Sequence, residues 1–370
     1  MAIAERLRHA RNSLGLTLNA VEERAEVGVS TLSDFENGKR EPKLAQLKRL
    51  ADAYGRPLSF FLEEGPVEPD VVLWRKKPDS PAAEEIQVRL QTLAQQYHNL
   101  EVWCGEQERC QIPFASGPPE SRFRYSDAAR LASGFRRSFG LGERPGQSLL
   151  RVLEEVSKVK VFHLPFEPTG SAACCLSDRF GAAILLNAKH VRWRRNFDLA
   201  HELFHLLTWN IFRQSVAGGG VEASEREEKL ATCFARNLLM PAEAFREAVD
   251  EQLSGEGKLG FPQLFEIARQ FDVSVEAVLW QLRFIYDISE EKIQDYIPQW
   301  RDQTSFWDTR EHDDPPERPL RFRALATQAL RQGAMSAGRF AEYVGVSRRE
   351  AMRVVEQEAE DDAQIEVANP

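Results

Sequence analysis

The most informative stretch of this chain reads Arg195-Asn-Phe-Asp-Leu-Ala-His-Glu-Leu-Phe-His205. On a helix, His201 and His205 lie one turn apart on the same face. Two imidazoles at this spacing can bind one zinc ion, while Glu202 leans toward the open coordination position. An apolar stripe runs beside the pair and predicts a helix over 196–209. Since two solvated surface histidines would not need such a stripe, the pattern favours a metal site over a surface histidine pair.

A metal site of this kind needs a third protein ligand. The next predicted helix, 224–240, ends before Pro241, and its start is rich in carboxylates: Glu222, Glu225, Glu227 and Glu228. Ser224 and Glu227 have capping-box spacing, which gives Glu227 a structural role. Glu228 shares a helix face with the small Ala231 and Ala235, so spacing favours it modestly. The alternative for each carboxylate is a solvated charge that interacts favourably with the helix dipole.

Composition limits the class of protein. The chain has 370 residues and a formal net charge of −9, and its length predicts two or three domains. Its hydrophobic content of 42% and charged content of 28% exclude wholesale disorder. No apolar run approaches the roughly 18 residues of a membrane span, and the N-terminus does not read as a secretory signal. We therefore expect a cytoplasmic protein with no membrane partner.

The five cysteines indicate a reducing compartment and no disulfide framework. Cys174 and Cys175 are adjacent and cannot share one tetrahedral metal site. Cys104 and Cys110 have no matching second pair. We interpret all of them, with Cys233, as buried or incidental thiols.

The first 64 residues predict a bundle of short helices joined by tight turns. A helix opens at Ile3, Gly15 ends it, and a second helix follows from about Thr17. Ser30 is the expected N-cap of the third helix, and Gly38 its stop. The fourth helix, 43–54, carries Leu44, Leu47, Leu50 and Ala51 on one face. This plan is typical of a helix-turn-helix domain.

The remaining chain alternates helices with a small sheet. Pro66, Pro69, Pro78 and Pro81 indicate a linker before a helix over 82–103. Strands are predicted at 159–163 and 182–187, with a loop or hairpin at 170–181 and helices at 126–139 and 148–159. Two helix-turn-helix-like segments are expected at 258–286 and 318–357. The last 15 residues hold six acidic residues and no basic one, so we expect this tail to be disordered.

The histidine stretch and the segment from Glu228 to Pro241 resemble the ImmA/IrrE metallopeptidase family. The resemblance covers roughly 125–245. It implies that His201, His205 and Glu228 bind Zn2+, and that Glu202 takes a proton from the attacking water. The oxyanion helper stays open among His163, His190, Arg192 and Arg195. The strand at 182–187 is a candidate for pairing with an extended substrate, or a simple core strand.

Residues 4–61 resemble the XRE family of helix-turn-helix domains, through motifs such as Gly28-Val-Ser30 and Phe35-Glu-Asn-Gly38. The resemblance implies double-stranded DNA as a partner. Phosphate contacts would come from Lys39 and Arg40, and base-edge contacts from Thr31, Ser33 and Asp34 on a recognition helix that starts at Ser30. The domain holds ten basic and ten acidic residues. Because the charges balance, we expect DNA binding that is weak, dimer-dependent or assisted by another protein. The alternative is a helix-turn-helix domain that contacts a protein instead of DNA.

The expected fold is α+β and predominantly helical, with a zincin-like metallopeptidase core and a small sheet. The predicted parts are a DNA-binding domain at 1–64, a linker and helical connector at 65–124, a metallopeptidase domain at 125–250, a C-terminal helical domain at 251–357 and the acidic tail at 358–370.

Two functions stay in competition at this point. The first is a zinc endopeptidase that binds DNA and cleaves a transcriptional repressor to control stress, phage or mobile-element genes. The second is a DNA-binding regulator or antitoxin-like partner whose metal site is sensory or structural. The sequence leaves the oligomeric state open, with a homodimer as one option.

Overall fold

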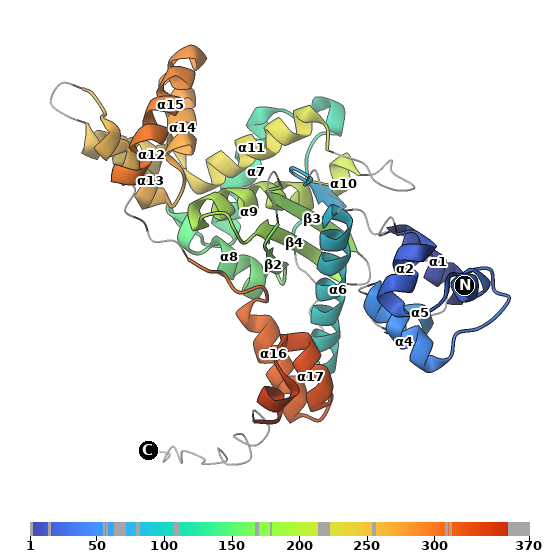
Figure 1. The fold of residues 1–370 in the computed structure, drawn as a ribbon. Helices are drawn as coiled ribbons and strands as arrows, with labels where there is room; N and C mark the ends of the chain where they lie inside the picture. Colours follow the sequence, from blue (N-terminus) through green and yellow to red (C-terminus); the bar gives the residue numbers. More distant parts are fainter. Residues whose placement is uncertain are drawn as a thin grey trace, which may run out of the picture.

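A computed structural model describes most of the chain. The described residues are 3–13, 16–54, 56, 58–62, 72–78, 82–106, 112–166, 170–177, 180–213, 223–253, 257–307, 310 and 313–353. Gly15, Cys110, Glu222 and the acidic tail, which the sequence singled out, lie outside them. The fold is mostly helical with one small sheet, as the α+β prediction stated (Figure 1). No helix of the described residues has the length and apolar character needed to cross a bilayer.

The N-terminal part is a bundle of five helices with its own core. They are α1 (Ile3–Ser13), α2 (Leu18–Ala25), α3 (Val29–Glu36), α4 (Leu44–Ala53) and α5 (Leu58–Leu62). Thr17 caps α2, since its side chain accepts a hydrogen bond from the Ala20 N–H. The predicted cap of α3 was wrong, because α3 begins one residue before Ser30 and Gly28 is its N-cap. Leu44 was also misplaced, since it is 68% exposed and α4 buries Leu47, Leu50 and Ala51 instead.

A four-stranded sheet organises the middle of the chain. Its strands are β1 (Val72–Trp74), β2 (Lys160–Leu164), β3 (Ala172–Ser177) and β4 (Gly181–Asn187), in the spatial order β1-β3-β4-β2. β3 pairs antiparallel with both β1 and β4, and β2 runs parallel to β4. The predicted 170–181 segment is therefore one arm of a hairpin. β4 lies between two strands, so the idea that it presents an edge to a substrate was wrong; β1 was not predicted.

Helices cover both faces of the sheet, because successive strand residues point to opposite sides. Ile184 and Leu186 face a core that contains α7 (Tyr125–Ser138), α9 (Arg192–Leu207) and α11 (Glu225–Leu239). Ala183 and Leu185 face a second core shared with α6 (Ala82–Trp103). The expected helix over 148–159 is the short α8 (Leu149–Arg151) continued by a π-helical turn at Val152–Val156. A short helix, α10 (Trp209–Phe212), follows α9.

The C-terminal helices divide between these two cores. Four helices extend the core around α9: α12 (Ala242–Gln252), α13 (Phe261–Phe271), α14 (Val275–Tyr286) and the unpredicted α15 (Glu290–Trp307). Two others, α16 (Leu320–Arg331) and α17 (Ala337–Val344), pack with α6 (Figure 1). The division of the chain at residues 64, 124, 250 and 357 stays a prediction.

Candidate metal centre and helix-turn-helix surface

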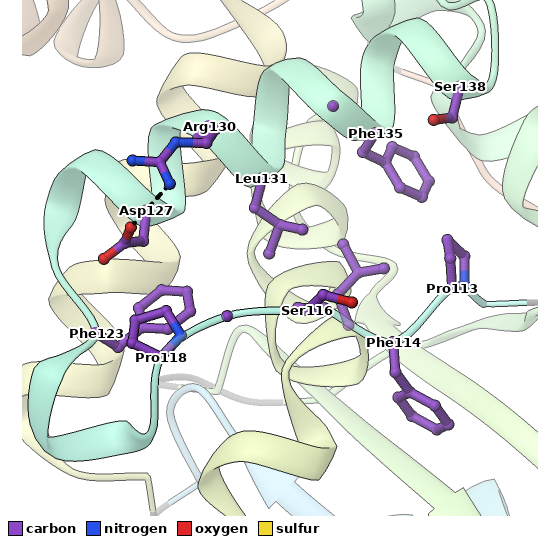
Figure 2. A pocket seen from close by; sticks show the side chains of 14 residues that line it. Pro113, Phe114, Ser116, Pro118, Phe123, Asp127, Arg130, Leu131, Phe135 and Ser138 are labelled. Atoms are coloured by element: carbon purple, nitrogen blue, oxygen red, sulfur yellow. Dashed lines mark ion pairs between the residues drawn. The ribbon is translucent and has the colours of Figure 1, made fainter.

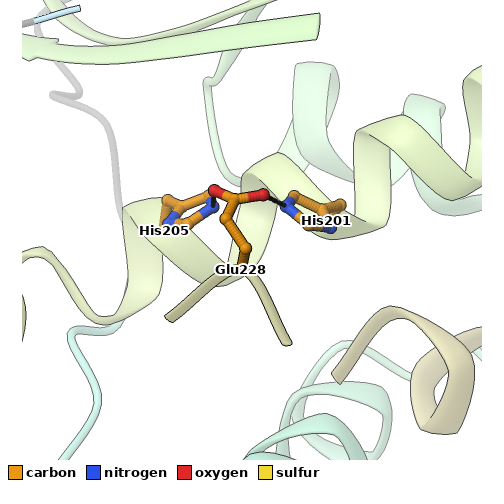
Figure 3. Close-up of side chains that lie close together, drawn as sticks. All are labelled: His201, His205 and Glu228. Atoms are coloured by element: carbon orange, nitrogen blue, oxygen red, sulfur yellow. Dashed lines mark hydrogen bonds and ion pairs between the residues drawn. The ribbon is translucent and has the colours of Figure 1, made fainter. Parts of the chain in front are cut away.

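Two adjacent helices bring three predicted ligands together. His201 and His205 lie one turn apart on α9, and Glu228 faces them from the first turn of α11 (Figure 3). One ligand atom from each residue lies within 4.8 Å of the others. Glu228 Oε2 is 3.0 Å from His201 Nε2, and Glu228 Oε1 is 3.3 Å from His205 Nε2. The side chains of both histidines are 1% exposed and that of Glu228 is 27% exposed, so the cluster is reached from the side of Glu228.

Glu227 supports the cluster from behind. Its Oε1 lies 2.8 Å from His205 Nδ1, and both of its oxygens accept hydrogen bonds from Arg213. Its backbone N–H donates to Ser224 Oγ, as the capping-box spacing predicted. An Nδ1–H donor on His205 leaves the Nε2 lone pair free to act as a ligand. The sequence had given Glu227 only the capping role.

The electrostatics of the cluster favour a bound cation. Burial, helped by the charge of Arg75, lowers the pKa of His201 to about 3. Burial acts to raise the pKa of the Glu228 carboxyl, but the two imidazoles outweigh burial and lower this pKa to about 2. At His205 the carboxylates of Glu227 and Glu228 likewise outweigh burial and raise the pKa to about 9. The carboxylates of Glu227 and Glu228 therefore favour positive charge at His205.

Glu202 lies on the same helix and is fully buried. Neither of its carboxylate oxygens has a hydrogen-bond partner among the described residues. Burial raises the pKa of Glu202 to about 7. The Cys174 thiol of β3 is its neighbour, and burial together with the Glu202 carboxylate raises the pKa of that thiol. A buried, unpartnered carboxylate with this pKa can accept and release a proton near neutral pH.

Arg75 was missed by the sequence analysis. It follows β1 directly and forms an ion pair with Asp198, whose side chain is 2% exposed and lies one turn before His201. His190 Nδ1 lies 3.3 Å from the other oxygen of Asp198. Residues far apart in sequence make this pair, so no local pattern signals it.

The four residues considered as oxyanion helpers are all engaged elsewhere. His163 is buried in β2, and His190 contacts Asp198. Arg192 pairs with Asp272, and Arg195 pairs with Asp313. The described residues therefore single out none of the four.

A cavity of about 530 Å³ lies between the first half of α9 and the helices α11, α14 and α15. Thr232, one turn beyond Glu228 on α11, and Asp198 line one side of it. Trp193, Trp280 and Trp300 provide aromatic walls. A second cavity, of about 300 Å³, lies between the segment 113–118 and α7, where Asp127 and Arg130 form an ion pair (Figure 2). None of His201, Glu202, His205 and Glu228 is among the residues that line either cavity.

The predicted DNA-contact residues lie on and after α3. Ser30, Lys39 and Arg40 are exposed, while Thr31, Ser33 and Asp34 are half-buried. The opposite face of α3 buries Leu32 and Phe35. Arg11 of α1 binds both oxygens of the buried Glu36 and so fixes α3 against α1. α3 thus presents one face to solvent, as a recognition helix does.

Comparison with known families identifies both parts. Residues 2–59 match the helix-turn-helix domain family, and residues 154–283 match the IrrE N-terminal-like domain of peptidase family M78. The chain therefore joins an N-terminal helix-turn-helix domain to a metallopeptidase-family domain of the ImmA/IrrE type. This confirms the resemblance drawn from the sequence.

Two individual proteins are also similar to this chain, one over its N-terminal part and one over most of its length. The HTH-type transcriptional regulator DdrOP3 of Deinococcus deserti is 40% identical over 63 residues, which cover 17% of this chain and 49% of that protein. The chain thus spans about half the length of this curated relative. ComR from Streptococcus suis aligns over 98% of this chain and 97% of its own, at 13% identity and a TM-score of 0.16. That score is too low to support a statement about the fold.

Proposed function

We propose that this protein is a zinc-dependent regulatory endopeptidase that binds DNA and cleaves a transcriptional repressor of stress, phage or mobile-element genes. The arrangement of His201, His205 and Glu228 beside the buried Glu202 carries the proposal. Two imidazoles and one carboxylate are a donor set that zinc accepts at catalytic sites. The match to a metallopeptidase family supports the same reading.

In this proposal, His201, His205 and Glu228 hold the zinc ion. Zinc supplies Lewis-acid polarisation of the peptide carbonyl and makes water more acidic. Glu202 accepts the proton of the attacking water and returns it to the leaving amine. Glu227 holds the His205 ring in place. The aromatic cavity whose lining includes Asp198 of α9 and Thr232 of α11 would give an extended polypeptide a surface on which to lie.

The N-terminal domain supplies the link to transcription. We propose that Thr31, Ser33 and Asp34 lie at base edges, on a recognition helix that includes Ser30, and that Lys39 and Arg40 contact phosphates. The relative named as a transcriptional regulator supports a role in gene control. The same similarity also favours the second candidate function, a DNA-binding regulator whose metal site is sensory or structural.

Glu202→Gln separates the two candidates. We expect this variant to keep zinc, because Glu202 is not among the three clustered ligand residues, and to lose cleavage by about 10²–10⁴-fold. Zinc content is measured by mass spectrometry, and cleavage by proteomics of cells that express each form. A repressor that disappears with the wild type and persists with Glu202→Gln supports the peptidase.

The matched control is Glu225→Gln, which neutralises an exposed carboxylate in the same helix turn as Glu228. It should behave as the wild type does. If Glu202→Gln regulates the same genes as the wild type and no protein is cleaved in either, the DNA-binding regulator is the correct function. A purified protein without stoichiometric zinc contradicts the proposed metal centre.

A further inference from the structure

The C-terminal segment repeats the geometry of the N-terminal helix-turn-helix. α2 and α17 are both eight residues long. Thr17 caps α2 through the Ala20 N–H at 3.2 Å, and Ser336 caps α17 through the Arg339 N–H at 3.3 Å. Another helix follows α17 and is described over 348–353. Three residues separate it from α17, as three residues separate α3 from α2.

The turns of the two units also correspond. α2 and α17 each end at a residue with left-handed backbone, with φ 53° at Glu26 and 75° at Gly345. The N–H of each residue bonds to the carbonyl four residues earlier. In the next helix, the Leu32 N–H bonds to Gly28 O and the Ala351 N–H to Ser347 O, both at 3.0 Å. All these positions share one constant sequence offset.

The same offset relates the buried positions. Val21 corresponds to Phe340 and Leu32 to Ala351, and all four are buried in their own cores. Ala351 is buried where Leu32 is, and the other described residues of this helix, 348–350, 352 and 353, are exposed. The three positions predicted to read bases on α3 correspond to Glu350, Met352 and Arg353, and Ser30 corresponds to Arg349.

This second unit is basic within an acidic protein. Residues 320–353 hold seven arginines and two glutamates, whereas the whole chain carries −9 and residues 1–64 balance to zero. Arg321 is neutralised by Glu101 and Glu106. Arg348, Arg349 and Arg353 are exposed, and none forms an ion pair with another described residue. At helical spacing they share one side with Met352, away from the buried Ala351.

We propose that residues 337–353 form a second helix-turn-helix that binds double-stranded DNA through Arg348, Arg349 and Arg353. Phosphate neutralisation supplies most of the affinity of such domains, and arginine can also bind guanine with two hydrogen bonds. A face with three exposed arginines suits a polyanion, because each guanidinium can neutralise a phosphate. The neutral N-terminal domain lacks this charge, so the two units complement each other on DNA.

The test uses the full chain and a random-sequence duplex of about 30 base pairs. Replacing Arg348, Arg349 and Arg353 with alanine should weaken binding at least about tenfold at low salt. The slope of log affinity against log salt should fall by about 2–3, since each lost phosphate contact contributes about 0.9. The matching triple lysine variant keeps the charge and should bind within about threefold of the wild type. Circular dichroism confirms that each variant is folded.

Two further variants complete the design. Alanine at the exposed Arg122, Arg130 and Arg151 removes the same charge elsewhere and should leave affinity and slope nearly unchanged. The double variant Lys39→Ala/Arg40→Ala measures the contribution of the N-terminal domain to DNA binding. Its loss of affinity should add to the loss caused by the three C-terminal arginine substitutions. The proposal is overturned if the alanine variant of Arg348, Arg349 and Arg353 binds DNA with wild-type affinity and salt slope. The exposed arginine face would then be a contact surface for a protein partner. An equal loss in the distant-arginine variant overturns it as well, because net charge alone would then explain the effect.

Discussion

At the scale of single residues, the centre depends on carboxylates in three different roles. Glu228 faces both imidazoles, Glu227 binds the far nitrogen of His205, and Glu202 is buried without a partner. Glu227 and Glu228 are neighbours in sequence, yet they approach opposite nitrogens of His205. The helix turns by about 100° per residue, so adjacent side chains reach different sides of one ring.

We predict that Glu227→Gln weakens zinc binding by about 10–100-fold, because the orientation and basicity of His205 depend on this carboxylate. Competition with a chromogenic chelator measures the affinity. Glu228→Gln should weaken it further, and the exposed Glu225→Gln should have no effect. Wild-type affinity in Glu227→Gln would show that His205 needs no such support.

At the scale of elements, the sequence patterns predicted the helices and strands that are stabilised by contacts between near neighbours in the chain. The apolar stripe of α9, the Ser224 cap of α11 and the 182–187 strand all appear where the sequence indicates. β1 is three residues long, and its partner β3 lies about a hundred residues further on. A strand this short is stabilised by its neighbour and not by its own periodicity, so the sequence around Val72 gave no sign of it.

β2 offers a test of pH dependence through His163. Burial, and then the charge of Arg195, lower the pKa of this imidazole to about 4, although Asp313 and the Pro316 carbonyl act in the opposite direction. The unfolded chain takes up the proton near pH 6.5. The free energy of unfolding should therefore fall as the pH drops from about 6.5 to 4, by up to about 3 kcal/mol from this group.

We predict that His163→Gln removes much of this loss of stability. Urea unfolding of wild type and variant at a series of pH values measures the difference between them. The difference in free energy of unfolding between wild type and variant should shrink by about 1–3 kcal/mol as the pH falls from about 6.5 to 4. Parallel curves would mean that His163 takes up its proton at the same pH in the folded and unfolded chains.

At the scale of the whole molecule, α6 connects the parts. Its Glu85 and Gln91 contact Arg24 and Arg56 of the N-terminal domain. Farther along the helix, Trp103 stacks on Tyr343 of α17, with 5.8 Å between the ring centroids. From Glu85 to Trp103 the helix spans about 27 Å at 1.5 Å per residue. Both helix-turn-helix units are therefore attached to one rigid helix that lies against the peptidase-like sheet (Figure 1).

The Arg75–Asp198 pair connects β1, the first described strand after the N-terminal domain, to the helix of the metal centre. We predict that Arg75→Met lowers stability by about 1–3 kcal/mol, since it removes the ion-pair partner of the buried Asp198 and leaves His190 and the charge of Arg194 near it. Peptidase activity should fall several-fold as well, because α9 carries His201 and Glu202 one turn later. Denaturant unfolding and cleavage kinetics measure the two effects.

Arg24→Ala is the matched control, because its pair with Glu85 is about half exposed on both sides. Such pairs contribute at most about 1 kcal/mol. If both variants unfold and cleave alike, the buried pair has no special role in supporting α9.

The sequence by itself determined the features that repeat within one helix or one turn. These are the helix-turn-helix plan of 1–64, the histidine pair on α9, the apolar strands and the start of α11, all of which depend on contacts between near neighbours. The tertiary structure decided that Glu227 and Arg75 support the histidine helix and that β1 pairs with β3. Those features depend on packing between helices and strands from distant parts of the chain, and side-chain direction across such contacts is set by the fold and not by spacing in the sequence.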